Sequence, residues 1–251
     1  MMDTTVMVVA LGAVAASFVQ GLSGFGFGMT ALSVWAWTLD PRLAAALAVF
    51  GALTGQIIAA LTVRRGFRLS ALAPFLLGGA LGIPIGVTLL PHLDMTLFKA
   101  GLGGLLALWC PAMLMAGRLP RIRRGGRLAD GIAGGLGGMM GGLGGFTGVI
   151  PTLWCTLRGF DKDEQRVIIQ NFNLAALSVT MAVYLARGLV TTAMLPLFAI
   201  VAPAMLVPTL LGARLYLGIS ETRFRQIVLS LLTLSGIALL SSSLPQLLAR
   251  P

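Results

Sequence analysis

The chain has 251 residues, of which 57% are apolar and only 10% are charged, whereas soluble domains carry about 25% charged residues. With a mean hydropathy of +0.94, this composition predicts an integral membrane protein and leaves almost no residues for a soluble domain. A net charge of +10 in a soluble chain would indicate nucleic-acid binding. Here the arginines lie in short loops between apolar segments, a pattern typical of membrane orientation. We therefore expect membrane lipid around the chain and no nucleic-acid partner.

Eight apolar segments follow one another along the chain. Six of them are near the roughly 20 residues that a membrane crossing needs. These six are residues 43–63, 70–90, 96–116, 166–186, 191–211 and 224–244. The other two, residues 4–39 and 129–157, are too long for one straight crossing. The composition and spacing predict an all-α polytopic membrane protein.

Each of the two long segments contains a glycine-rich interruption. The first is QGLSGFGFG at residues 20–28, and the second is GGLGGFTGVIP at residues 141–151. Glycine costs about 1 kcal/mol and proline about 3 kcal/mol relative to alanine inside a helix. In lipid, non-helical backbone is tolerated only where protein buries it or where it lines a cavity. We predict that one helix ends near Gly144 and another begins near Val149, with a similar break in the first segment.

The two interruptions also match each other in sequence. At a spacing of 121 residues, Gly21, Leu22, Gly24 and Phe25 correspond to Gly142, Leu143, Gly145 and Phe146, and Asp40 corresponds to Asp161. We predict a first repeat over residues 1–117 and a second over residues 129–251, each with four apolar segments and each beginning with a broken or re-entrant helix. Residues 118–128, which include five arginines, form a basic cytoplasmic linker between them.

The loop charges distinguish two topologies. If the broken segments each cross the membrane once, lysine and arginine divide 10 to 7 between the two sides; if they return as hairpins, the split is 14 to 3. Because cytoplasmic loops carry an excess of lysine and arginine, the hairpin topology is favoured. It places both termini in the periplasm and makes the repeats inverted, a common plan among secondary transporters.

The breaks are the first candidate binding site. A helix that restarts in the membrane presents free N–H groups and a partial positive charge, and two such ends facing each other would hold an anion. The alternative is that the glycines serve close helix packing, as the spacing of Gly78, Gly82 and Gly86 also indicates. A second candidate is a line of polar residues on one helix face, Arg166, Gln170, Asn173 and Thr180. These side chains either form a path for the anion or make hydrogen bonds to neighbouring helices.

The predicted substrate site comprises Gln20, Ser23, Gly24, Phe25, Gly26, Gly144, Gly145, Phe146, Thr147, Arg166, Gln170 and Asn173. We interpret Gln56, an isolated polar residue in an apolar segment, as a structural hydrogen-bonding group. Trp35, Trp37, Trp109 and Trp154 are candidates for anchors at the membrane interface. No apolar segment carries an ionisable residue near its middle, and no catalytic pair, metal-binding cluster or nucleotide-binding motif is visible. We predict no enzymatic activity, no cofactor and no metal.

These motifs resemble a known family. GLSGFGFG in the first half, GGLGGFTGVIP in the second, DKDEQR just beyond it, and two four-segment repeats around a basic linker are similar to the TauE/SafE family of bacterial sulfite exporters. The first half lacks the proline that follows the glycines in many members. The resemblance implies transport of sulfite, a sulfonate, sulfoacetate or a related small anion, with the two broken motifs as the substrate site.

The expected function is therefore secondary transport of a small sulfur-containing anion across the bacterial inner membrane by alternating access. An anion channel and a non-transporting membrane subunit of a larger complex remain alternatives. The sequence leaves open whether the chain forms a homo-oligomer, which anion it moves and in which direction.

Overall fold

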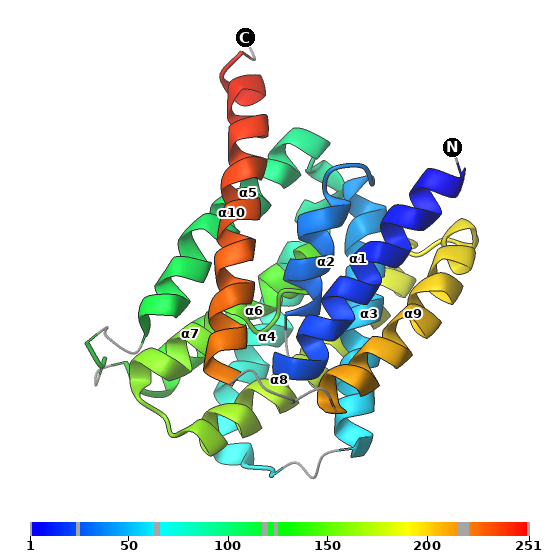
Figure 1. Cartoon of the computed structure of the whole chain (residues 1–251). Coiled ribbons are helices and arrows are strands. Elements are labelled where there is room, and N and C mark those ends of the chain that lie inside the picture. The colour runs from blue at the N-terminus through cyan, green and yellow to red at the C-terminus, as the bar shows by residue number, and fades with distance from the viewer. Residues whose placement is uncertain are drawn as a thin grey trace.

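A computed structural model describes residues 2–23, 26–62, 66–116, 120–122, 125–214 and 221–249. The described part of the chain is helical and contains no strand (Figure 1). Its elements are α1 (Met2–Ser23), α2 (Phe27–Trp35), α3 (Pro41–Thr62), α4 (Leu69–Leu89), η1 (Leu90–His92), α5 (Met95–Met115), α6 (Gly126–Gly144), α7 (Val149–Arg158), α8 (Lys162–Ala186), η3 (Thr192–Met194), α9 (Leu195–Arg214) and α10 (Glu221–Leu248). Six of the helices (α1, α3, α4, α5, α8 and α10) are long and apolar enough to cross a membrane.

Both predicted helix breaks are confirmed. α1 ends at Ser23 and α2 begins at Phe27, while α6 ends at Gly144 and α7 begins at Val149. α2 has 9 residues and α7 has 10. At a rise of 1.5 Å per residue, each is about 15 Å long, half the thickness of a bilayer's hydrocarbon core. Neither short helix crosses a membrane by itself.

Each short helix folds back along the helix before it. At the end of α2, the indole Nε1 of Trp35 donates a hydrogen bond to the carbonyl of Val8 near the start of α1, at 3.1 Å. Gly12 leaves room for that indole, because a Cβ there would overlap the ring. In the second half, Nε1 of Trp154 in α7 donates to Oδ1 of Asp130 in α6 at 2.7 Å. Both pairs are antiparallel hairpins.

The expectation that the tryptophans lie at the membrane interface is wrong for two of the four. Trp35 is 0% exposed and Trp109 is 4% exposed, and Nε1 of Trp109 donates to the carbonyl of Val149 at 2.8 Å. Buried indole N–H groups need an acceptor, which is a carbonyl of α1 for Trp35 and the carbonyl at the start of α7 for Trp109. Trp154 is half-buried against Asp130, whereas Trp37 is 42% exposed and lies under Nζ of Lys99.

α7 is held to α6 by a cluster around Asp130. Besides the hydrogen bond from Trp154, the Asp130 carboxylate lies 4.0 Å from Nε of Arg158, and the two side chains are 9% and 19% exposed. The Arg158 guanidinium also lies over the rings of Trp154 and Phe160, at 5.9 and 5.5 Å. A buried carboxylate therefore fixes the far end of this hairpin.

Asp130→Ala is expected to destabilise the protein by about 2 kcal/mol or more, because it leaves a Trp154 N–H and the Arg158 guanidinium without their acceptor. Thermal unfolding in detergent should show a melting temperature several degrees lower. Asp163→Ala, which removes an exposed carboxylate at the start of α8, is the control and should leave it nearly unchanged. Equal melting temperatures for the two variants would contradict this role of Asp130.

The glycines of α4 bring it into backbone contact with α6. A Cβ at Gly78 would overlap the carbonyl oxygen of Gly131, and one at Gly82 would overlap that of Gly135. The packing interpretation is therefore correct for these glycines. α1 packs along α9, and α5 packs along α10.

The loops gather at two ends of the bundle. At one end, Nη1 of Arg68 lies 3.6 Å from Oε1 of Glu164, and the Ile122 N–H donates to the carbonyl of Leu157 at 2.8 Å. At the other end, Nη2 of Arg42 donates to the carbonyl of Pro91 at 3.0 Å. The loop before α8 therefore lies at the same end of the bundle as the loop before α4. A second broken segment that crossed the membrane once would place these two loops at opposite ends, so this arrangement excludes a single crossing of that segment.

The described basic side chains are unequally divided between these ends. One end holds Arg68, Arg121, Arg127, Arg158, Lys162, Arg166, Arg223 and Arg225; the other holds Arg42, Lys99 and Arg187. The first end is called the basic end below. α1 begins and α10 finishes at the opposite end, as Figure 1 shows at the top of the view.

Candidate functional site

The two helix breaks meet in the middle of the bundle. Gly145 in the second break lies against the backbone of Val49, and the amide Nε2 of Gln20 near the first break donates to the carbonyl of Ala52 at 3.4 Å. Val49 and Ala52 are near the centre of α3. Gly28, in the first turn of α2, packs against the carbonyls of Gly144 and Gly145. The breaks are therefore in contact and lie halfway along a membrane-length helix.

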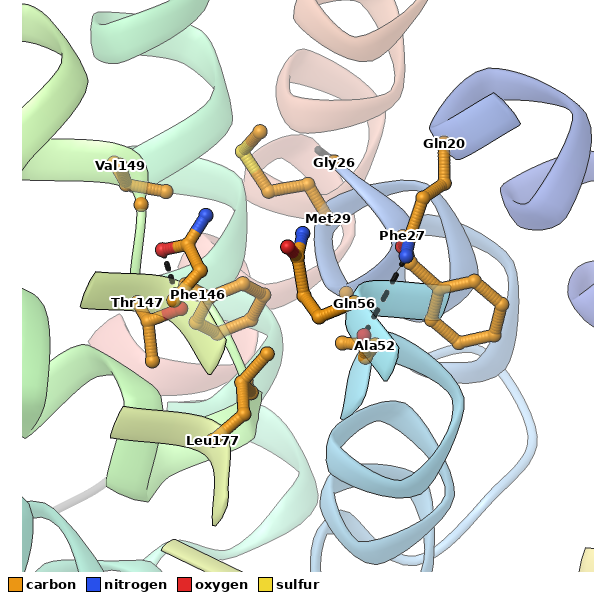
Figure 2. A pocket seen from close by; sticks show the side chains of 14 residues that line it. Gln20, Gly26, Phe27, Met29, Ala52, Gln56, Phe146, Thr147, Val149 and Leu177 are labelled. Atoms are coloured by element: carbon orange, nitrogen blue, oxygen red, sulfur yellow. Dashed lines mark hydrogen bonds between the residues drawn. The ribbon is translucent and has the colours of Figure 1, made fainter. Parts of the chain in front are cut away.

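A cavity lies between the breaks and the middle parts of α3 and α8 (Figure 2). It offers about 30 Å³ of space to the centres of water-sized groups. Its walls are Gln20, Gly26, Phe27, Gly28, Met29, Ala52, Gln56, Gly145, Phe146, Thr147, Gly148, Val149, Asn173 and Leu177. None of these residues carries a charged side chain, so any ion in the cavity must be held by dipoles.

α2 points its N-terminus at this cavity. Gly26 caps the helix with φ of 97°, a left-handed conformation that glycine adopts without strain. The first helical hydrogen bond runs from the Thr30 N–H to the carbonyl of Gly26 at 3.0 Å. The N–H groups of Phe27, Gly28 and Met29 precede it and have no acceptor within the helix. They give this wall of the cavity donors and a partial positive charge.

The second break arranges its donors differently from the prediction. Gly145 has φ of 78°, and its N–H donates to the carbonyl of Gly141 while that of Phe146 donates to the carbonyl of Met140. This is a Schellman-type cap, which satisfies the last carbonyls of α6. The N–H groups of Gly145 and Phe146 are therefore engaged. Within the described residues, those of Thr147 and Gly148 have no acceptor.

Four polar side chains complete the walls, and all are at most 5% exposed: Gln20, Gln56, Thr147 and Asn173. The Thr147 hydroxyl donates to Oδ1 of Asn173 at 2.9 Å. This bond leaves the Nδ2 group of Asn173 as a donor for the cavity. Figure 2 shows the Gln56 amide between the ring of Phe146 and the side chain of Met29. The cavity thus combines amide and backbone donors with apolar walls.

Half of the predicted site residues line this cavity: Gln20, Gly26, Gly145, Phe146, Thr147 and Asn173. Gly144 lies just outside it, beneath Leu32 and the ring of Phe146. Ser23 ends α1, but its side chain, like all of Gly24 and Phe25, lies outside the described residues.

Arg166 and Gln170 do not line the cavity. Arg166 is in the second turn of α8, exposed at the basic end, and Gln170 is half-buried one turn further along. The polar line on α8 therefore reaches the cavity only at Asn173. Thr180, two turns beyond it, is fully buried, and its hydroxyl has no partner among the described residues.

The sequence interpretation missed Gln56, which lies in the wall of the cavity. A usable signal was present in the spacing of 121 residues that relates the two breaks. The same spacing relates Ala52 to Asn173 and Gln56 to Leu177, and all four line the cavity. It also relates residues 26–28 to residues 147–149, which line it too. Extending the comparison into the neighbouring helices would have directed attention to α3, because Ala52 corresponds to the predicted Asn173 and Gln56 lies one turn beyond Ala52.

The comparisons with known proteins agree with this architecture. Searches of curated proteins and of solved structures gave no significant match. A family model described as "Sulfite exporter TauE/SafE" matches residues 8–239, nearly the whole chain and every helix described above. Members of this family are membrane transporters of sulfite and related anions. The chain is a multi-pass membrane protein that belongs to the sulfite exporter TauE/SafE family.

Proposed function

We propose that this protein exports a small sulfur oxyanion such as sulfite, and that the anion binds in the cavity between the two helix breaks. One observation carries the proposal: a cavity whose described walls carry no charged side chain, and into which a helix N-terminus, two loop N–H groups and three side-chain amides are directed. Such donors stabilise a desolvated anion. They hold it without a buried basic residue, which would bind it too tightly for release.

The size of the cavity supports a compact substrate. A single water molecule needs roughly 10–15 Å³ measured in the same way, so about 30 Å³ accommodates only a few heavy atoms. Sulfite has four heavy atoms. Sulfoacetate and taurine are larger and would require the walls to move apart. We therefore favour an inorganic oxyanion over an organic sulfonate as the substrate.

The proposed mechanism is alternating access between inverted repeats. The correspondence of cavity-lining residues at a spacing of 121 supports two related halves that both contribute to the cavity. Transporters built this way bind substrate near the bilayer midplane and expose it to each side in turn. With no charged side chain in the cavity wall, coupling would come from the membrane potential acting on the anion, or from a proton carried on it.

We further propose that the basic end faces the cytoplasm of a bacterial inner membrane, as the charge bias requires. In intact cells, an impermeant thiol reagent should label His92→Cys but should reach Asp163→Cys only after permeabilisation; both positions are exposed. The native Cys110 and Cys155 are buried, so the unmodified protein is the blank. The reverse pattern of labelling would overturn this orientation.

The function is tested with sulfite binding and sulfite flux. Sulfite should raise the melting temperature of the purified protein more than sulfate, sulfoacetate, taurine or acetate does, and proteoliposomes should show saturable sulfite flux. Flux that does not saturate would favour a channel. A folded protein that neither binds sulfite nor transports it would favour a subunit of a larger complex.

Thr147→Val should weaken sulfite binding about ten-fold, since it removes a hydroxyl from the cavity and the hydrogen bond that positions Asn173. The matched control is Thr54→Val in α3, whose hydroxyl bonds only to the carbonyl of Phe50 and is outside the cavity. If both variants bind sulfite like the unmodified protein, the site has been placed wrongly.

A further inference from the structure

A second cavity adjoins the first. It lies between α1, the start of α2 and the first half of α10, and offers about 20 Å³ to water-sized groups. Gly26 and Met29 line both cavities. Met29 is 3% exposed, and it lines the first cavity together with Gln56 (Figure 2). Met29 is therefore part of the partition between the two spaces.

The second cavity has one charged residue among its described walls, Arg225, which is in the second turn of α10 at the basic end. Arg225 is exposed, and its Nη2 donates to the carbonyl of Met113 at 3.3 Å. The other walls are glycine and apolar side chains, including Phe224, Val228 and Leu229. A single positive charge beside apolar walls attracts anions and discriminates against cations.

We propose that the second cavity is the approach by which the anion reaches its site from the basic end, with Arg225 selecting for negative charge and Met29 acting as the gate between the cavities. Methionine suits this role, because its unbranched side chain has three rotatable bonds and repacks easily. A rotation of Met29 joins the two spaces without moving a helix. The identity of the cargo rests on the function proposed above, whereas the path is tested without sulfite.

The selectivity of the approach is measured with a pair of thiol reagents, an anionic sulfonatoethyl and a cationic trimethylammonioethyl methanethiosulfonate, acting on Val228→Cys. The anionic reagent should react faster, and Arg225→Gln should lower the ratio of the two rates about five-fold. Arg225→Lys should retain the ratio. The neighbouring Arg223→Gln is the control and should also leave it unchanged. A ratio that does not depend on residue 225 would overturn the role of Arg225.

The gate is measured by labelling Gln56→Cys, whose thiol would lie in the first cavity, with methyl methanethiosulfonate, which transfers only a small thiomethyl group. If the gate is open in about a tenth of the molecules, the thiol reacts about ten-fold more slowly than it would behind an open gate. Met29→Ala removes the gate, so it should raise the rate of Gln56→Cys labelling by that factor. Met205→Ala, which trims a buried methionine of α9 outside both cavities, should not. Equal rates for the two variants would show that Met29 is only a packing residue.

The result is separable from that of the transport assay. If both labelling effects appear but sulfite neither binds nor moves, the path stands and the proposed cargo is wrong. If sulfite is transported but neither effect appears, the anion enters by another route and this inference fails.

Discussion

Gly82→Leu is expected to leave almost no folded protein. A Cβ at Gly82 would overlap the carbonyl oxygen of Gly135, and it would lie only 2.8 Å from that residue's carbonyl carbon and 2.9 Å from the Met139 nitrogen. All these atoms belong to the backbone of α6, so no side chain can rotate away to make room. Overpacking by even one methylene costs about 1–3 kcal/mol, and leucine adds four carbons, against a total stability of about 5–15 kcal/mol.

The matched control is Gly104→Leu in α5, where no atom lies within 4 Å of the added Cβ. Detergent extracts of the two variants should be compared by size-exclusion chromatography and by thermal unfolding. The control should elute as a single peak with an unchanged melting temperature, while Gly82→Leu should aggregate. A well-folded Gly82→Leu protein would show that α4 and α6 are not in backbone contact.

Replacing two of the three amides of the cavity wall, as Gln56→Leu with Asn173→Leu, is expected to abolish sulfite transport. A hydrogen bond to a charged group contributes about 1.5–3 kcal/mol, so each single change should weaken binding about ten- to a hundred-fold. Asn173→Leu also removes the acceptor of the Thr147 hydroxyl. The two amides come from different helices, α3 and α8, so the double variant removes a donor from each of two walls of the cavity.

Sulfite flux in proteoliposomes measures the loss of activity, and thermal unfolding verifies that each variant is folded. Asn171→Leu is the control, since Asn171 bonds to the carbonyls of Gly66 and Val167 and is outside the cavity. It should transport at the normal rate. Normal transport by the folded double variant would mean that the anion passes through another part of the molecule.

The features predicted well from the sequence are those that local chemistry determines. Residues 131–144 are helical despite their glycines, and the break comes at Gly145, which adopts φ of 78°; this is close to where the composition of residues 131–151 predicts it. The apolar segments predicted the long helices correctly, because a segment that faces lipid must form the hydrogen bonds of its backbone internally, as a helix does. The charge bias between loops favoured hairpins, and for the second broken segment the contact of Arg68 with Glu164 agrees with that choice.

The features that were missed depend on contacts between distant parts of the chain. Gln56 looked isolated on its own segment, and only the approach of both breaks to α3 makes it part of the cavity. Arg166 shares a helix face with Asn173 in sequence but lies at the solvent-exposed end of α8. The engaged N–H groups of Gly145 and Phe146 depend on the direction in which the chain leaves α6. None of these can be read from the residue types and spacing of one segment.

The close contact of α4 with α6, and that of α1 with α9, has a consequence for how such a molecule can move. Each pair joins a helix from one half of the sequence to a helix from the other, and the glycine seam of α4 and α6 leaves no side-chain layer in which they could slide. Halves that are interlocked in this way cannot rock against each other as separate blocks. In the proposed alternating-access cycle, the rigid bodies would therefore each be composed of helices from both halves, and the flexible joints would lie between such mixed units.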